Sequence, residues 1–209
     1  MQKLDLRNWN RKEHFDFFST FEEPFFGIVS EVDCTKAHQF SKNNNRSFFA
    51  HYLHKSLIAV NEIPEFKYRI LDGEVVVYEQ VHSAATIARP NGTFAFSFAK
   101  FDTDFSIFHK SLKKEIEEVQ NTTGLRLSEA SQRLDAIHIS SFRWHKLTGL
   151  THARNFKYPD SVPKITFGKM YSLGNEYKLP VAINVHHGLM DGFHVAKFLE
   201  VFQKLLDSE

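Results

Sequence analysis

The chain of 209 residues fits one domain and is long enough to bury a sizeable hydrophobic core. Its 26 Lys and Arg nearly balance its 25 Asp and Glu, so its charge indicates neither nucleic-acid binding nor an anionic membrane partner. The single cysteine, Cys34, excludes an intrachain disulfide and a cysteine-rich zinc site. The N-terminal segment is charged throughout and no apolar run approaches roughly 18 residues, which predicts a cytoplasmic protein without a secretory signal or a membrane span.

Phenylalanine is unusually frequent, with 22 residues against 6 tyrosines and 2 tryptophans. Most of these rings are expected in the core, and several are candidates for lining a pocket that binds an apolar ligand. No internal repeat, low-complexity tract or linker interrupts the sequence, so residues 1–209 are predicted to form a single domain.

The first half of the chain alternates between helical and strand-like patterns. Apolar residues at helical spacing predict a helix over 47–60, which Pro64 ends because the residue before a proline avoids the α region. Asp72–Gly73 predicts a hairpin turn before the strand-like run 74–81. Strict alternation of Phe with small residues predicts a strand over 93–101, whose Phe face requires a cover.

The second half begins with a helical pattern over 104–120 and a strand over 135–141. Residues 164–172 and 178–186 read as a long hairpin, and an amphipathic helix starts at Gly192. Helices are interleaved with strands that tight turns join. This mixture predicts an α/β fold of the α+β two-layer type, a mixed β-sheet covered by helices, and not a doubly wound parallel sheet.

The end of the last predicted strand is the most informative segment. Side chains alternate along a strand, so His186 and His187 point to opposite sides and at most one of them faces a given cleft. Histidine, with an ordinary pKa of about 6.5, is a natural general base near neutral pH. Asp191 stands near a helix start, where the helix dipole favours a carboxylate. The pattern HHxxxDG at a strand-to-helix junction is far more specific than a histidine pair and marks a candidate catalytic site.

The same segment leaves a metal hydrolase open as an alternative. His186, His187, Asp191 and His194 are plausible ligands at close spacing. Against a metal site, the two adjacent histidines diverge if the strand continues through them, and the spacing differs from that of a helix-borne HExxH pair. We therefore expect no metal or prosthetic group.

HHGLMDGFH at 186–194 resembles the HHxxxDG motif of chloramphenicol acetyltransferases and of the catalytic cores of lipoamide acyltransferases. Further segments resemble the chloramphenicol enzymes specifically: WNRKEHF at 9–15, PEFKYR with DGE at 64–74, and ITFGK at 165–169. The resemblance covers nearly the whole chain. It implies the CoA-dependent acyltransferase fold and an enzyme that moves the acetyl group of acetyl-CoA to a hydroxyl of a small acceptor, as in antibiotic resistance. It also implies a homotrimer with active sites at the subunit interfaces.

The resemblance assigns a role to each catalytic residue. His187 matches the general base, whose other ring nitrogen is bonded to a main-chain carbonyl. Ser140 matches the serine that donates to the oxyanion of the tetrahedral intermediate, and Thr166 matches a threonine that helps to stabilise it through an ordered water. Asp191 matches an aspartate that pairs with Arg11, an ion pair that is architectural and not a proton relay.

The resemblance also indicates the binding residues. Lys169 matches a lysine near the phosphate end of CoA, and Trp144 is assigned to the same cofactor side. Direct transfer in a ternary complex is implied, with no acyl-enzyme. The acceptor pocket is expected to include Phe17, Phe18, Phe25, Phe94 and His152.

The acceptor pocket is where the sequence departs from the chloramphenicol enzymes. In an alignment without a gap from Trp144 to Thr166, His152 and Arg154 replace two apolar residues, and Phe18 stands where tyrosine is common. An apolar ring would lose contact area there, while buried polar groups would need new partners. The transfer chemistry is expected to be intact, with the acceptor open between chloramphenicol and another compound. A non-catalytic binder of an apolar ligand remains an alternative, and so does a lipoamide acyltransferase core, which the lack of a lipoyl segment and linker disfavours.

Overall fold

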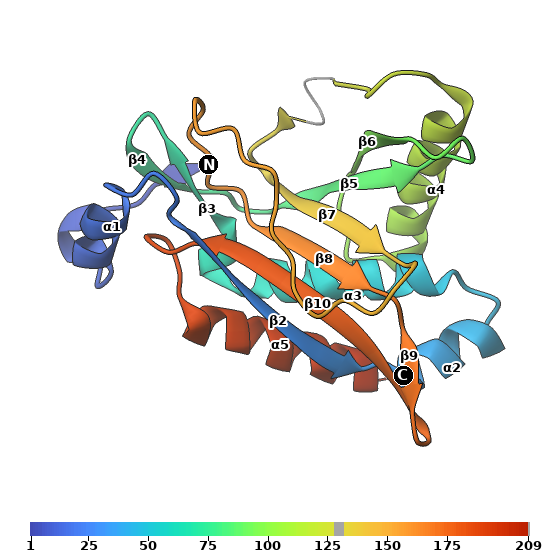
Figure 1. The fold of residues 1–209 in the computed structure, drawn as a ribbon. Helices are drawn as coiled ribbons and strands as arrows, with labels where there is room; N and C mark the ends of the chain where they lie inside the picture. The colour runs from blue at the N-terminus through green and yellow to red at the C-terminus, as the bar shows by residue number, and fades with distance from the viewer. Residues whose placement is uncertain (128–131, 209) are drawn as a thin grey trace.

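The computed structural model describes residues 1–127 and 132–208. In these ranges a seven-stranded mixed sheet forms the centre of the fold (Figure 1). Its spatial order is β2 (Phe25–Asp33), β10 (Glu176–His186), β8 (Lys164–Gly168), β7 (Ala136–Phe142), β5 (His82–Ala88) and β6 (Phe94–Ala99), with β9 (Tyr171–Leu173) paired to β10 off this path. The β5–β7 and β7–β8 pairs are parallel, and the other pairs are antiparallel.

A smaller sheet and the helices surround this centre. The small sheet has the order β1 (Gln2–Lys3), β4 (Glu74–Val77), β3 (Tyr68–Leu71). The α-helices are α1 (Lys12–Phe18), α2 (Thr35–Asn43), α3 (Phe48–Glu62), α4 (Phe105–Asn121) and α5 (Gly192–Asp207), and the short 3₁₀ helices are η1 (Leu6–Asn8) and η2 (Pro64–Lys67). Figure 1 shows α3 and α5 on the same side of the large sheet. The predicted α+β fold, a mixed sheet covered by helices, is confirmed.

The hydrophobic core lies between the sheet and these two helices. Ile165 and Ile183 point from β8 and β10 into this core, where they join Leu53 of α3 and Phe198 of α5. Because side chains alternate along a strand, the neighbouring residues of β8 and β10 face the other side of the sheet. The core face is therefore apolar, and the opposite face is free to carry chemistry.

The helices end where the sequence predicts. Ser47 accepts a hydrogen bond from the Ala50 N–H at the start of α3, and Ile63 is extended before Pro64 at its end. Asp104 caps α4 in the same way, by accepting from the first backbone N–H groups of the helix. The helices expected over 47–60, over 104–120 and from Gly192 are confirmed to within two residues.

The predicted hairpins are partly corrected. The turn at Asp72–Gly73 is confirmed, with both residues at positive φ, but the strand that follows ends at Val77 instead of running to residue 81. The first arm of the long hairpin is divided into β8 and β9 after Gly168. Gly168 would be the next partner of Pro180 on β10, and a proline has no N–H to donate to the ladder. The division of that arm follows from the missing donor.

The Phe-rich strand is confirmed as β6, but its buried face is the opposite of the expected one. Ala95 and Ala99 are buried in the same core cluster as Phe108 of α4, whereas the Phe94 side chain is 47% exposed. Small residues allow the helix to approach the sheet closely. The Phe side is only partly covered, since Phe96 and Phe98 are half-buried and Arg133 lies over the ring of Phe98. None of the described helices is long and apolar enough to cross a membrane.

Candidate active site

Two hydroxyl groups meet on the face of the sheet away from α3 and α5. The parallel register of β7 and β8 places Ser140 beside Thr166, and their hydroxyl oxygens are 2.7 Å apart. Both residues line a pocket with a volume of about 680 Å³. Because a hydroxyl can donate to an oxyanion, this pair is suited to stabilising a tetrahedral intermediate in the pocket.

The residues assigned to the cofactor line the same pocket. Lys169 is exposed and the Trp144 side chain is 63% exposed, so both are accessible to a ligand. Phe94, expected on the acceptor side, also lines this pocket. The structure therefore brings together five of the residues singled out in the sequence, from β6, β7, β8 and the segments that follow β7 and β8.

His187 lies at a different place, directly after the end of β10. Its N–H donates to the carbonyl of Pro24 at 2.8 Å. Its ring stacks on Phe18, with centroids 4.0 Å apart and planes at 7°, and Phe26 lies against it with centroids 4.5 Å apart. The buried ring atom Nδ1 has no hydrogen-bond partner among the described residues, so the expected bond to a main-chain carbonyl is not found. The orientation of the ring is instead fixed by the two phenylalanines.

His186 points to the opposite side, as strand alternation predicts. Its ring contacts Phe25, with centroids 5.7 Å apart, and its Nδ1 accepts a hydrogen bond from the Gly188 N–H at 3.1 Å. Burial, together with the positive charge of Arg154, lowers the pKa of His186 to about 4. The ring is therefore neutral at pH 7, and its Nδ1 stabilises the turn that follows β10. In residues 1–127 and 132–208, no three His, Cys, Asp or Glu side chains are grouped so as to hold a metal ion.

Arg11 connects the end of β10 with the start of α5. Its side chain is buried, and it donates from Nη1 to Asp191 Oδ2 at 2.6 Å and from Nη2 to the carbonyl of His187 at 3.0 Å. Asp191 is also the N-cap of α5 and accepts from the Phe193 N–H. Burial alone would raise the pKa of Asp191, but the hydrogen bond and charge of Arg11 outweigh it and lower the pKa. The expected ion pair is present, and it reaches the backbone of His187 directly.

The two groups of residues do not meet within one chain. Thr166 pairs with Ala182 on β10, and His187 is five residues further along the chain. At about 3.3 Å per residue, this places His187 about 17 Å along the sheet from the hydroxyl pair. A general base must lie within hydrogen-bond reach of the proton that it removes. A single copy therefore does not assemble the whole site.

A smaller polar pocket, with a volume of about 260 Å³, adjoins the first one at Leu150, which lines both. The expected acceptor residues Phe25 and His152 lie there, whereas Phe17 lines neither pocket and packs on Phe18 and Phe21. The pocket is lined by Glu23, Phe25, Gly27, Leu150, Thr151, His152, Arg154, Lys164 and Asn184.

Sequence reasoning missed Lys164 and Asn184. Lys164 is two residues before Thr166 on the same strand, so it shares a face with Thr166. Asn184 is the β10 partner of Lys164 in the antiparallel register. The period of two was visible in the sequence, but the register that joins these strands was not.

Comparisons with known proteins match the chain over nearly its whole length. A model of the family "Chloramphenicol acetyltransferase" matches residues 1–203. The chloramphenicol acetyltransferase of Proteus mirabilis is 28% identical, over 98% of this chain and 94% of that protein. The corresponding protein of Campylobacter coli is 27% identical, over 98% of each. A solved structure of a chloramphenicol acetyltransferase is 31% identical with a TM-score of 0.90, covering 98% of this chain and 99% of that one. A probable dihydrolipoamide acetyltransferase from Listeria monocytogenes, at 13% identity and a TM-score of 0.69, shows the shared fold alone.

Proposed function

The chain belongs to the chloramphenicol acetyltransferase family, and from this premise we propose that it is an acetyl-CoA-dependent O-acetyltransferase acting on a hydroxyl of chloramphenicol or a related small acceptor. The observation that carries the proposal is the Ser140–Thr166 hydroxyl pair, 2.7 Å apart in the wall of a pocket of about 680 Å³. Paired hydroxyls in the wall of a pocket are suited to stabilising a transient oxyanion, which acyl transfer generates.

The reaction follows from the roles of three side chains. His187 Nε2 accepts the proton of the acceptor hydroxyl, whose oxygen attacks the thioester carbonyl and forms the new C–O bond. The carbonyl electron pair moves to oxygen, where Ser140 Oγ donates a hydrogen bond while Thr166 orients it. Collapse of the intermediate breaks the C–S bond, and His187 returns the proton to the thiolate of CoA. The products are an acetyl ester and free CoA, with no acyl-enzyme.

The large pocket fits the cofactor. Lys169 would hold a CoA phosphate by charge, and the exposed ring of Trp144 would cover the chain of the cofactor. Met170 and Leu179 add apolar wall on the same side. In this arrangement the thioester would reach the hydroxyl pair at the inner end of the pocket.

We propose a homotrimer in which His187 of one copy faces the hydroxyl pair of its neighbour. The separation of about 17 Å along the sheet within one chain supports this arrangement, because one copy cannot bring base and oxyanion donor to the same atom. The half-exposed Phe94 gives a further apolar surface for such a contact. Cys34 is a free, buried thiol, in keeping with the reducing cytoplasm where we place the enzyme.

Release of free CoA thiol from acetyl-CoA tests the proposal, with chloramphenicol as the first acceptor. We expect acceptor-dependent release that disappears in His187→Ala and persists in His14→Ala, a substitution of an exposed histidine. If a folded trimer releases no CoA thiol with any hydroxyl acceptor, the protein is a non-catalytic binder and not an enzyme. If chloramphenicol gives no release but another acceptor gives His187-dependent release, the mechanism is kept and the antibiotic is excluded as substrate.

A further inference from the structure

A row of polar residues crosses the sheet one step away from the hydroxyl pair. His138 pairs with Lys164, and Lys164 pairs with Asn184, while Ser140 pairs with Thr166 in the next row. Side chains two residues apart on a strand share a face and lie about 7 Å from each other. An acceptor whose hydroxyl lies near Thr166 can therefore reach Lys164 with its other end.

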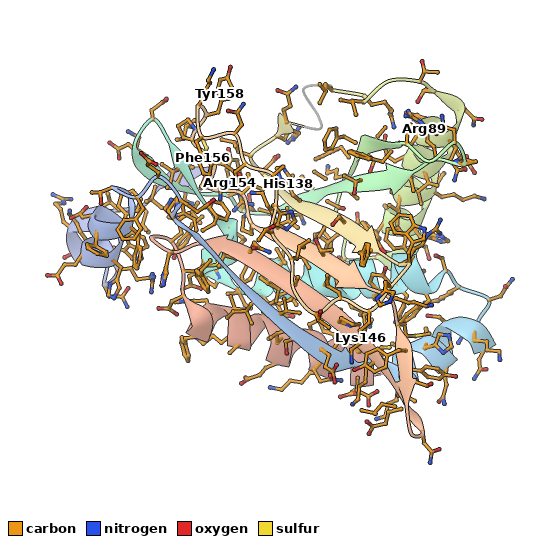
Figure 2. The ribbon with its side chains drawn as sticks, viewed as in Figure 1. Arg89, His138, Lys146, Arg154, Phe156 and Tyr158 are labelled. Carbon is orange, nitrogen blue, oxygen red and sulfur yellow. The ribbon has the colours of Figure 1, made fainter. Side chains whose placement is uncertain are left out.

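This second row carries positive charge in an enclosed place. Lys164 and Arg154 both line the polar pocket, and their side chains are only 9% and 11% exposed. The two cations lie over the ring of Phe25, at 4.4 and 3.7 Å from its centroid. Figure 2 shows Arg154 projecting over the same part of the sheet as His138, with Phe156 and Tyr158 farther out along the loop. Two buried cations at one ring require negative partners.

The carboxylates beside the two cations differ in exposure, since the Asp160 side chain is 27% exposed and Glu23 is more exposed. Lys164 donates to Asp160 at 2.5 Å and to the Val162 carbonyl at 3.1 Å, which leaves Asp160 as a fixed partner beside the pocket. Arg154 donates from Nη1 to Glu23 at 2.8 Å, and its Nε lies 3.8 Å from Asp160 Oδ2. Glu23 Oε1 also accepts from the Phe25 N–H at 3.0 Å, and the Glu23 side chain is 46% exposed. An exposed carboxylate returns to water at little cost. Glu23 therefore occupies the position in which another carboxylate could bind Arg154.

A further donor in the pocket has no partner. The Nε2 atom of His152 is buried, and no described residue forms a hydrogen bond with it. Burial and the charges of Lys164 and Arg154 lower the pKa of His152, so its ring is neutral at pH 7 and can present an N–H. Buried polar atoms without a partner are rare in folded proteins. A ligand with an acceptor oxygen would satisfy this one.

We propose that the acceptor is a hydroxy compound that carries a carboxylate. This carboxylate displaces Glu23 and binds Arg154, and Lys164 and His152 complete the pocket. The proposal rests on the proposed function, because it names the substrate class of the same site. A neutral, apolar acceptor would leave His152 Nε2 without a partner and would gain no attraction from the two cations, so it would bind less well.

Three matched acceptors test the charge preference: 3-phenyllactate, its neutral methyl ester, and the cationic (2-hydroxy-3-phenylpropyl)trimethylammonium, which has the same secondary hydroxyl and no amine that could be acetylated. We expect kcat/KM, measured as CoA thiol release, to be at least tenfold higher for 3-phenyllactate than for the other two. Arg154→Leu should abolish this preference, Arg154→Lys should restore part of it, and Arg7→Leu, at an exposed arginine, should leave it unchanged. Glu23→Gln should lower KM for 3-phenyllactate several-fold, because it removes the competing carboxylate. Equal kcat/KM for the acid and its ester, or an unchanged KM in Glu23→Gln, would overturn the proposal.

Binding of 3-phenylpropionate separates this inference from the proposed function, because that acid has no hydroxyl to acetylate. Calorimetry should show binding that requires Arg154 and is at least tenfold weaker for 3-phenylpropanamide. If the acid binds in this way but no acceptor is acetylated, the anion pocket stands and the proposed function fails. If chloramphenicol is acetylated while 3-phenylpropionate binds no better than its amide, the enzyme stands and the anion pocket is wrong.

Discussion

His187 lies in the junction between β10 and α5, and Ser140 lies in the wall of the large pocket. These two regions are held in place by different means. At the junction, side chains connect distant parts of the sequence: Arg11 bonds Asp191 and the carbonyl of His187, which are 180 and 176 residues away. In the wall, the backbone ladder of β7 and β8 sets Ser140 against Thr166, and the two hydroxyls bond to each other. The junction can therefore be disrupted at one side chain while the fold remains, whereas the wall changes only in the group that is removed.

Removal of the base should produce the largest effect on activity. His187→Ala is expected to lower kcat by about 10²–10⁴-fold, the usual contribution of general base catalysis. Phe18 and Phe26 would still pack at the site, so the stability of the fold should change little. Steady-state CoA release measures the loss, and sedimentation confirms that the assembly is retained. His14→Ala is the matched control, and a loss below tenfold in His187→Ala would contradict its role as base.

Removal of the oxyanion donor should come next. Ser140→Ala is expected to lower kcat by about 10²–10³-fold, because one hydrogen bond to the developing charge is lost. KM should change little, since the hydroxyl acts on the intermediate and not on the bound substrates. Ser106→Ala, at an exposed position of α4, controls for the loss of a hydroxyl. A raised KM with unchanged kcat in Ser140→Ala would show that the hydroxyl binds substrate instead.

The ion pair at the junction should affect stability and activity together. Arg11→Met is expected to lower the free energy of unfolding by about 2–3 kcal/mol, less than for a fully buried pair because the Asp191 side chain is 33% exposed. It should also lower kcat, because the carbonyl of His187 loses its donor. Urea unfolding and CoA release measure the two effects, and Arg7→Met, at an exposed pair, should show neither.

The same pair has a defined pH dependence. Since Arg11 lowers the pKa of Asp191 in the folded state, the stabilisation is complete above the ordinary value of 3.8 and is lost as the pH falls through the folded pKa. The difference in unfolding free energy between wild type and Arg11→Met should therefore be constant above about pH 4 and shrink below it. A difference that grows in acid would contradict the ion pair.

The sequence predicted the parts of this molecule that depend on local pattern. The starts of the helices near Ser47 and Asp104, the turn at Asp72–Gly73 and the divergence of the two histidines all follow from residues close in sequence. The pairing of Lys164 with Asn184 could not be predicted from the sequence, because strand register depends on contacts between distant segments. The buried face of β6 was assigned wrongly for the same kind of reason: helix α4, not the size of the side chains, decides which face is covered. The polar pocket is built from such non-local pairings.

The smallest of the expected effects concerns His186, which separates the junction from the polar pocket. Its pKa is about 4 in the folded state against an ordinary 6.5, so the unfolded chain binds a proton between these values and the folded chain does not. The contribution of His186 to the free energy of unfolding should therefore be complete above pH 6.5 and fall as the pH drops towards 4, by about 1.4 kcal/mol per pH unit.

In His186→Asn, whose Oδ1 can still accept from the Gly188 N–H, the loss of stability between pH 7.5 and 5 should be about 2 kcal/mol smaller than in wild type. Urea unfolding at both pH values measures this, with His14→Asn as the exposed control. Burial also lowers the pKa of His138 to about 4, so the stability of the variant should still decrease somewhat as the pH falls. An identical slope in wild type and His186→Asn would mean that the His186 ring is not kept neutral by burial, and that the turn after β10 admits water.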